Sequence, residues 1–213
     1  IRVDLNVPMS NGIIENDTRI RATIPTIKLA LQSNCSIILM SHMGRPKEGI
    51  FEKDLSLNSV AENLSSALRR EVRFISNWDK DFDINNGDIV LMENVRFLKG
   101  EKNNDPDLSK KMGELCDIFV MDAFASAHRS HASTCGVIEF AKIACIGPLF
   151  SYELESLQRI FSNPKRPVLA IVGGSKISTK LEVITSLSKS VDYLILGGGI
   201  ANTVLKAMGF EIG

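Results

Sequence analysis

The chain has 213 residues, and its 25 basic and 25 acidic side chains give a formal net charge of zero at pH 7. This balance gives no electrostatic reason for a nucleic acid or an anionic membrane to bind, and we expect neither as a partner. With 44% hydrophobic and 23% charged residues, the composition is typical of a globular protein and excludes a disordered one. The opening Ile1-Arg2-Val3-Asp4 does not resemble a signal peptide, and no apolar run approaches the ~18 residues that a membrane span needs.

Short runs rich in Ile, Val and Leu alternate along the chain with segments of helical periodicity. Gly, Asn, Asp or Pro bound these runs, as is typical of parallel strands that are buried on both faces. The expected strands are Ile1–Val7, Ser36–Met40, Val72–Ile75, Ile89–Met92, Ile118–Met121, Ile143–Ile146, Val168–Val172 and Tyr193–Leu196. The expected helices are Arg21–Leu31, Ser56–Arg69, Leu108–Leu115, Leu149–Phe161, Ile177–Lys189 and Ile200–Met208. The alternation predicts an α/β fold, a Rossmann-like three-layer parallel sheet with helices on both faces.

A domain boundary is predicted around position 148. Gly147-Pro148 opens a helical segment, and the stretch Asn163-Pro164-Lys165-Arg166-Pro167 closes it with two prolines. We expect a first domain in residues 1–148, a connector helix in 149–166 and the beginning of a second domain in 167–213. Roughly 46 residues are below the size at which a domain usually stands alone, so we expect the second domain to be incomplete.

The four cysteines stand at positions 35, 116, 135 and 145, and no pair has the spacing C-x-x-C. Cys35, Cys116 and Cys145 lie within or beside apolar runs. We therefore expect buried, reduced thiols in a cytoplasmic protein rather than a disulfide framework.

Polar and basic side chains directly follow several of the expected strands. Arg45, Arg96 and Arg129 each come shortly after a different strand, and Arg19 lies just ahead of the first helix. In an open parallel sheet, ligands bind beyond the carboxyl ends of the strands. Guanidinium groups bind phosphate or carboxylate through paired hydrogen bonds, each contributing ~1.5–3 kcal/mol. If the strands are neighbours, these residues form a basic cleft for a phosphorylated metabolite; the alternative is a set of scattered surface arginines.

The three histidines are candidates for anion contacts or for metal ligands. His42 lies in a turn bounded by Gly and Pro, which favours an anion contact. His128 and His131 could together bind a metal ion, but zinc needs a third and a fourth ligand, and Arg129 would repel the ion. We identify no metal ligand in this chain.

Two glycine-rich loops stand in the last third of the chain. Gly173-Gly174-Ser175-Lys176 follows a strand and is expected to open a helix, with Lys176 and Lys180 one turn apart on the same helix face. The loop lacks the full P-loop pattern. The Gly197–Gly199 loop resembles a dinucleotide fingerprint, but Asn202 stands where a third Gly or Ala is expected. Both loops can present backbone N–H groups to a phosphate; the alternative is a pair of ordinary tight turns.

Taken in order, these motifs resemble those of the phosphoglycerate kinase family, and the resemblance covers essentially every residue of the chain. The motifs that carry it are Arg2–Pro8, Asp17–Ile20, Ser41–Pro46, Leu91–Phe97, Asp122–Arg129, Gly173–Lys180 and Gly197–Ala201. Family members have a short segment before Ile1 and most of a second domain after Gly213. The resemblance thus implies a two-domain kinase with a truncated second domain.

The resemblance implies transfer of a phosphoryl group between 1,3-bisphosphoglycerate and ADP, giving 3-phosphoglycerate and ATP. The acceptor is a carboxyl group, Mg-ATP and Mg-ADP act as substrates, and family members are typically monomeric. It implies in-line transfer after hinge closure at the connector helix, with Arg19 and Lys176 as catalytic residues. It assigns substrate binding to Asp4, Leu5, Asn6, Arg19, His42, Met43, Gly44, Arg45, Arg96 and Arg129. It assigns nucleotide binding to Gly173, Gly174, Lys176, Lys180, Gly197, Gly198 and Gly199.

The chain departs from the family pattern in two ways. Ala125 replaces a usual glycine, and alanine would add roughly 1 kcal/mol of strain if this position needs a positive φ. The family's acidic nucleotide contact and its Gly-Gly-Asp-Thr loop are absent from these 213 residues. We therefore expect weak phosphoglycerate binding and no turnover by this chain alone. The alternative function is a non-catalytic module that binds a phosphorylated metabolite, and a reading frame that continues past Gly213 would favour the enzyme.

Overall fold

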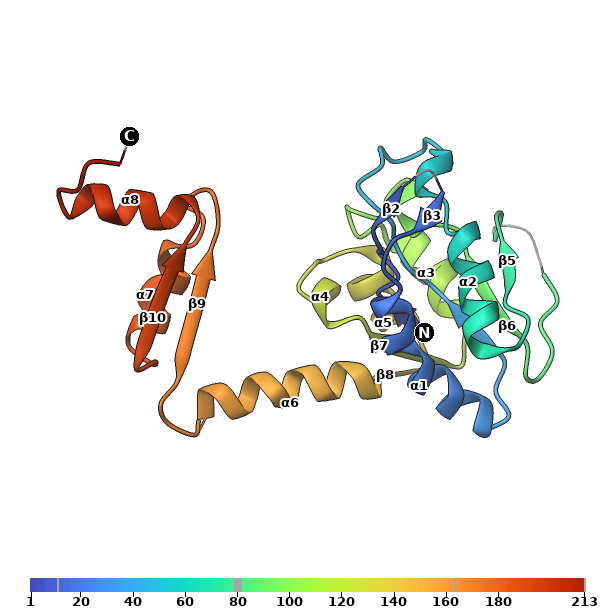
Figure 1. The fold of residues 1–213 in the computed structure, drawn as a ribbon. Helices are drawn as coiled ribbons and strands as arrows, with labels where there is room; N and C mark the ends of the chain where they lie inside the picture. Colours follow the sequence, from blue (N-terminus) through green and yellow to red (C-terminus); the bar gives the residue numbers. More distant parts are fainter. Residues whose placement is uncertain (11, 79–81, 163, 213) are drawn as a thin grey trace. The chain divides into compact units, whose positions relative to one another are not determined.

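The computed structural model describes residues 1–10, 12–78, 82–162 and 164–212 (Figure 1). Its contacts divide the chain into Ile1–Leu154, here called unit 1, and Glu155–Gly213, here called unit 2. Each unit is described by itself. The finer division into residues 1–148, 149–166 and 167–213 stays a prediction, and Asn163 and Gly213 lie outside the described residues.

Unit 1 contains a parallel sheet whose strands follow the order β5-β6-β4-β1-β7-β8. Hydrogen bonds define two three-stranded parts, β4-β6-β5 and β1-β7-β8, and a parallel bridge between Arg2 and Met40 joins them. All strand pairs within these two parts are parallel, which confirms the predicted parallel α/β fold. The strands are β1 (Arg2–Val3), β4 (Ile37–Leu39), β5 (Arg73–Ile75), β6 (Ile89–Met92), β7 (Ile118–Asp122) and β8 (Ile143–Ile146).

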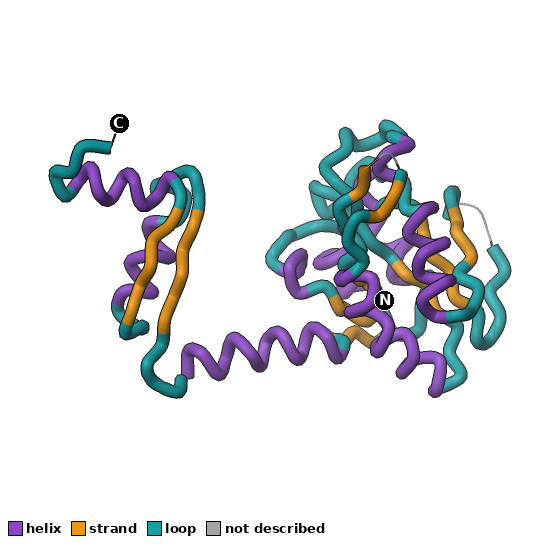
Figure 2. The backbone as a smooth tube through the Cα atoms, in the orientation of Figure 1, coloured by secondary structure: helices purple, strands orange, loops and turns teal. Residues whose placement is uncertain are grey.

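Helices pack on two faces of this sheet, because alternate residues of each strand point to opposite sides. Leu39 and Leu91 belong to a core with α1 and α2, whereas Met40 and Met92 belong to a second core with α3 and α5. The helices, drawn in purple in Figure 2, are α1 (Thr18–Gln32), α2 (Asn58–Leu68), α3 (Pro106–Glu114), α4 (Phe124–Ala127) and α5 (Val137–Phe140). Shorter elements are β2 (Met9–Ser10), β3 (Ile13–Ile14), the 3₁₀ turns η1 (Lys53–Leu55) and η2 (Val95–Phe97), and the π-helical turn η3 (Ala132–Gly136).

The first strand is shorter than the predicted Ile1–Val7. Only Arg2 and Val3 pair as strand residues, and the chain then leaves the sheet. The backbone N–H of Leu5 donates to Ser41 Oγ at 2.9 Å, and that of Asn6 donates to Asp4 Oδ1 at 3.1 Å. Side-chain acceptors thus replace the strand ladder as partners of these backbone donors.

Ala125 lies inside α4, so its backbone is helical. The strain that we considered for an alanine at this position therefore does not arise, because a helical residue has negative φ.

Unit 2 contains β9 (Leu169–Gly173) and β10 (Tyr193–Gly197), a parallel pair, with α7 (Leu181–Ser188) and α8 (Gly199–Ala207). The helix α6 (Pro148–Ser162) precedes them. Apolar side chains of both strands are exposed, as shown by Ile171 at 70% and Tyr193 at 62%. The prediction that these strands are buried on both faces is therefore wrong for the described residues, because two strands and two helices cover too little of the pair.

The predicted burial is also wrong for β8 and for three of the four cysteines. All four residues of β8, an edge strand of the unit 1 sheet, are exposed. The four cysteines are free thiols, but Cys35, Cys135 and Cys145 are exposed and only Cys116 is half-buried. Apolar neighbours in the sequence do not bury a side chain that lies on an edge strand or at the end of a helix.

Asp122, at the end of β7, is a buried carboxylate that joins three segments of the chain. It is fully buried and accepts a hydrogen bond from Thr26 Oγ1 of α1 at 2.5 Å. It also accepts the backbone N–H of Phe150 in the first turn of α6 at 2.9 Å. A Cβ at Gly147 would lie 2.3 Å from Asp122 Oδ1, so this approach requires the glycine. The carboxylate therefore satisfies an N-terminal donor of α6 and holds α1 to the sheet.

We expect Asp122→Ala to lower the free energy of unfolding of unit 1 by about 2–4 kcal/mol, because two donors lose their acceptor in a buried site. Urea denaturation followed by the fluorescence of Trp78, the only tryptophan, measures this effect. Trp78 is buried in unit 1. Asp117→Ala is the matched control, since Asp117 is 87% exposed and pairs with the exposed Lys142. Equal losses in the two variants would contradict this role for Asp122.

Candidate functional site

Four neighbouring strands of unit 1 bring predicted site residues to one edge of the sheet. The strand order places β6, β4, β1 and β7 side by side, and all run parallel. Their carboxyl ends therefore lie at the same edge. Arg96 follows β6, Arg45 follows β4, Arg19 follows β1 in α1, and Arg129 follows β7 after α4. These four residues are here called the arginine cluster.

Three members of the arginine cluster, Arg45, Arg96 and Arg129, interact electrostatically. Burial lowers the pKa of Arg96, and the positive charges of Arg129 and Arg45 lower it further. Both effects disfavour the charged guanidinium. An anion bound between these side chains would relieve their mutual repulsion.

Arg96 has an open hydrogen-bond donor within this cluster. The residue is only 5% exposed, and its Nη1 donates to the backbone carbonyl of Gly44. Its Nε is buried and has no partner among the described residues. Buried donors are nearly always paired, so a donor without a partner in a basic site is suited to an anionic ligand.

The turn His42-Met43-Gly44-Arg45 is held by a side chain that the sequence did not single out. The side-chain amide of Asn94 accepts the backbone N–H of Met43 at 3.1 Å and donates to its carbonyl at 2.8 Å. Gly44 has φ +58°, and a Cβ there would lie 2.6 Å from Leu55 Cδ2. The turn therefore requires a glycine, and Asn94 fixes its backbone.

Asp4 and Asn6 already have partners in unit 1. Asp4 Oδ2 accepts a hydrogen bond from Arg19 Nη1 at 2.9 Å, and the Arg19 side chain is 50% exposed. Asn6 Oδ1 accepts the backbone N–H of Gly44 at 2.9 Å, which ties the segment after β1 to the turn after β4. These bonds bring the residues to the arginine cluster, but the substrate roles assigned to them stay predictions.

Leu5 and Met43, by contrast, have buried side chains. Leu5 is fully buried, Met43 is 3% exposed, and both belong to the core beside α1 and α2. They can therefore contribute to a ligand site at this edge only through their backbone.

His42 is buried beside several positive charges. Burial, followed by the charges of Arg2 and Arg96, lowers the pKa of His42 to about 2. Its ring is therefore neutral at physiological pH. A neutral imidazole can offer one N–H to a ligand without adding a charge to the arginine cluster.

Unit 2 brings the two glycine-rich loops together. The backbone N–H of Ile200 donates to the carbonyl of Gly174 at 3.1 Å. Gly198 has φ +62°, and a Cβ at Gly199 would lie 2.7 Å from the carbonyl oxygen of Ser175. The close approach of the two loops therefore requires glycine at these positions. Helix α8 begins at Gly199, one residue before the predicted start at Ile200.

The prediction for the two lysines is wrong in one respect. Helix α7 begins at Leu181, so Lys176 and Lys180 do not share a helix face. Lys180 instead caps the helix, and its Nζ donates to the carbonyl of Gly173 at 2.9 Å. Lys176 is exposed. A turn separates the first glycine loop from its helix, so the loop does not open the helix directly.

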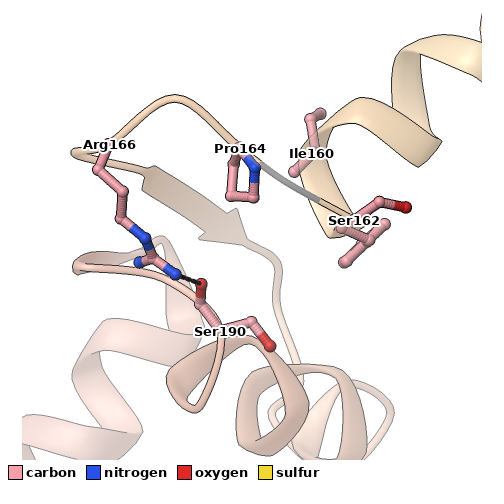
Figure 3. A pocket seen from close by; sticks show the side chains of 6 residues that line it. Ile160, Ser162, Pro164, Arg166 and Ser190 are labelled. Atoms are coloured by element: carbon pink, nitrogen blue, oxygen red, sulfur yellow. Dashed lines mark hydrogen bonds between the residues drawn. The ribbon is translucent and has the colours of Figure 1, made fainter.

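A pocket in unit 2 lies at one end of the β9–β10 pair (Figure 3), and the glycine loops lie at the other end. It has a volume of about 380 Å³ and is lined by Ile160, Phe161, Ser162, Pro164, Arg166 and Ser190. Arg166 Nη2 donates to the Ser190 carbonyl at 3.4 Å, and Arg166 Nη1 pairs with Asp192 at 2.9 Å. These residues precede β9 and β10, whereas the glycine loops follow them. The pocket therefore contains none of the predicted nucleotide contacts.

Comparison with known proteins decides the family. A family model described as phosphoglycerate kinase matches residues 1–213. The chain belongs to the phosphoglycerate kinase family. This confirms the resemblance inferred from the ordered motifs.

The relatives are longer than this chain. The phosphoglycerate kinase of Coxiella burnetii is 54% identical over 213 residues, which cover 100% of this chain and 54% of that protein. That of Legionella pneumophila strain Corby is 53% identical with the same coverage. The chain thus spans about half the length of the curated relatives it matches.

Solved structures of phosphoglycerate kinases share this fold. The structure from Coxiella burnetii matches with a TM-score of 0.87 at 54% identity and covers 100% of this chain and 54% of that one. The structure from Pyrococcus horikoshii OT3 also matches with a TM-score of 0.87, at 29% identity, over 100% of this chain and 55% of that one.

No group of three or more His, Cys, Asp or Glu side chains that could hold a metal ion occurs in the described part of the chain. Likewise, none of the helices within the described ranges is long and apolar enough to cross a membrane.

The depressed pKa of His42 makes stability depend on pH. In the unfolded chain His42 binds a proton near its ordinary pKa of 6.5, whereas the folded chain excludes the proton down to about pH 2. Its stabilising contribution is therefore present above pH 6.5 and is lost as the pH falls below that value. Between pH 7 and 5.5 we expect the unfolding free energy to drop by about 1 kcal/mol more in the native chain than in His42→Gln.

Urea denaturation at the two pH values, followed by Trp78 fluorescence, measures this difference. The pKa of His131 is lowered and that of Glu101 is raised, but both groups are present in both chains, so their effects cancel in the comparison. Parallel pH dependence of the two proteins would show that His42 titrates normally in the folded chain.

Proposed function

We propose that the protein transfers a phosphoryl group between 1,3-bisphosphoglycerate and ADP, giving 3-phosphoglycerate and ATP, and that unit 1 of this chain binds the phosphoglycerate. The observation that carries the proposal is the arginine cluster at the carboxyl edge of the sheet, with an Arg96 Nε that has no partner among the residues that the structure describes. Membership of the phosphoglycerate kinase family supports the reaction. The protein would be a glycolytic phosphotransferase with a carboxyl group as acceptor.

Within unit 1, the phosphate of the substrate would be held by Arg45, Arg96, Arg129 and His42. Three guanidinium groups and one neutral N–H donor provide charge and directed hydrogen bonds to a dianion. Asp4, Asn6 and Arg19 would address the carboxyl end of the substrate. Arg19 is exposed and shares its charge with Asp4, so it can reorient toward the transferring group.

Unit 2 would contribute contacts to the nucleotide through the glycine loops around Gly174 and Gly198. The glycine-rich ends of β9 and β10 and the N-terminus of α8 suit phosphate groups, because the start of a helix favours a negative charge. Magnesium would enter with ATP or ADP as part of the substrate. Lys176 is exposed and would neutralise charge on the transferring phosphoryl group.

The mechanism is in-line transfer without a covalent enzyme intermediate. The protein positions the acylphosphate and the nucleotide and stabilises the charge that spreads over the equatorial oxygens of the transferring group. Arg19 and Lys176 are the catalytic residues in this proposal. Hinge bending at α6, a monomeric state and a cytoplasmic location are further parts of it, and they rest on the family resemblance.

Calorimetric titration with 3-phosphoglycerate tests the substrate site. Arg45→Ala and Arg129→Ala should each weaken binding at least about tenfold, because each removes charge-assisted hydrogen bonds of ~1.5–3 kcal/mol. Arg21→Ala is the control, since Arg21 is exposed and pairs with Asp17 on its own helix. Unchanged affinity in the two site variants would refute the assignment of the cluster.

A coupled assay tests what the 213 residues can do by themselves. Supplied with 1,3-bisphosphoglycerate and ADP, the separately produced chain should form no ATP above background, because the family's Gly-Gly-Asp-Thr loop and acidic nucleotide contact are not among these residues. The full-length phosphoglycerate kinase of Coxiella burnetii is the positive control. ATP formation by the chain alone would show that the remaining nucleotide motifs are dispensable.

A further inference from the structure

Arg2 is a buried arginine of unit 1 that lies in the motif Arg2–Pro8 but has no role in the proposed reaction. It lies in β1 and is 2% exposed. Its Nη1 donates to the carbonyl of Val3 at 2.6 Å, and its Nε donates to Ser133 Oγ at 3.2 Å. The remaining nitrogen, Nη2, lies 3.0 Å from Nδ1 of His42. A buried guanidinium that contacts a ligand-site imidazole can determine what the imidazole does.

The contact between Arg2 and His42 has only one possible direction. A guanidinium has five N–H donors and no acceptor, so Nδ1 of His42 must accept the bond with its lone pair. Nδ1 then carries no proton, and the single ring proton of neutral His42 resides on Nε2. An imidazolium is excluded by the same contact, because it would place two N–H groups against each other.

Arg2 remains charged despite its burial because an acidic partner lies close by. Glu101 is fully buried, and its carboxylate accepts Ser133 Oγ at 2.6 Å and the Ser133 backbone N–H at 3.0 Å. Burial lowers the pKa of Arg2 to about 10, and the charge of Glu101 opposes this shift. Arg2 is therefore protonated at neutral pH and keeps its full set of donors.

Glu101, Ser133, Arg2 and His42 thus form one chain of contacts. The carboxylate orients the Ser133 hydroxyl, the hydroxyl oxygen accepts from Arg2, and Arg2 donates to His42. Networks of this kind hold a side chain in one orientation and one protonation state.

We propose that Arg2 is a positioning residue, which holds His42 as the neutral tautomer with its proton on Nε2 and so makes the ring a hydrogen-bond donor to the bound anion. The benefit of this donor rests on the proposed function, because it presupposes that the arginine cluster binds phosphoglycerate. Without Arg2, the ring could place its proton on Nδ1 and present a lone pair from Nε2 to the phosphate. That arrangement repels an anion instead of binding it.

The tautomer can be measured without any ligand. Long-range ¹H–¹⁵N correlation spectra of the ¹⁵N-labelled chain separate protonated from unprotonated ring nitrogens for its three histidines. At neutral pH we expect an unprotonated Nδ1 and a protonated Nε2 for His42, assigned by comparison with His42→Gln. A protonated Nδ1 in the native chain would overturn the proposal, whatever the chain binds.

The variant Arg2→Met keeps the apolar stem and removes the donors. We expect the His42 signals to lose their tautomer preference, whereas those of the exposed His128 stay unchanged as an internal control. An unaltered His42 tautomer in folded Arg2→Met would also overturn the proposal. The second variant is the double substitution Arg2→Met with Glu101→Gln. It is needed because Arg2→Met alone leaves the buried carboxylate of Glu101 without its positive partner, which can destabilise the fold.

A double-mutant cycle separates positioning from general structural support. Calorimetry with 3-phosphoglycerate should show at least about a fivefold loss of affinity for Arg2→Met in the native background and no further loss in the His42→Gln background. Equal losses in both backgrounds would mean that Arg2 acts independently of His42 and would contradict the proposal. Failure of the native chain to bind 3-phosphoglycerate would count against the proposed function, while the ligand-free spectra would still decide the Arg2–His42 assignment.

Discussion

The parallel pairing of β1 with a neighbour on each side is the constraint on which the site in unit 1 depends. Arg2 and Val3 pair with Met121 and Asp122 of β7, and the backbone N–H of Val3 donates to the carbonyl of Met40 at 3.0 Å. These two residues join the two halves of the sheet. The loops that follow β4 and β7 therefore flank the segment after β1, at the point where an open parallel sheet binds its ligands.

A concentration of positive charge at this edge has to be compatible with a folded protein. Burial and like charges disfavour the charged form of Arg96, and they depress the pKa of His42 to about 2. The negative charge of the buried Glu101 carboxylate opposes the lowering of the Arg96 pKa. The site is thus organised before a ligand arrives, with donors in place and repulsion that an anion would relieve. Such preorganisation costs stability in the free protein and favours binding of a small dianion.

The two units differ in how much of their apolar surface the described residues cover. Unit 1 has cores on both faces of its sheet. In unit 2, Val172 and Ile200 are the buried hydrophobic residues within the described ranges. Its glycine loops nevertheless contact each other through the backbone, where the N–H of Ile200 donates to the carbonyl of Gly174. Lys180 also holds the first loop, because its Nζ donates to the carbonyl of Gly173. One of the two lysines predicted to bind the nucleotide is therefore hydrogen-bonded within unit 2 itself.

The sequence by itself determined the fold class, the positions of most strands and helices, and the residues that gather at the sheet edge. Hydrophobic periodicity and the Gly, Pro and Asp boundaries are properties of single segments, so runs such as Ile89–Met92 are predicted at their observed bounds. The arginines after the strands were recognisable because the carboxyl edge of a parallel sheet is a general site for ligands. The ordered motifs were specific enough to indicate the family before any comparison.

Only the tertiary structure decided which polar side chains are buried and what they contact. Arg2 and Ser133 are 131 positions apart, and no local pattern relates them. Asn94 lay inside a recognised motif, but its role in holding Met43 depends on the adjacency of β4 and β6. The start of α7, the exposure of β8 and the burial of Glu101 were also beyond local reasoning. Sequence patterns report the period of one segment, whereas the partner of a buried polar group or an apolar face comes from another segment that only folding brings near.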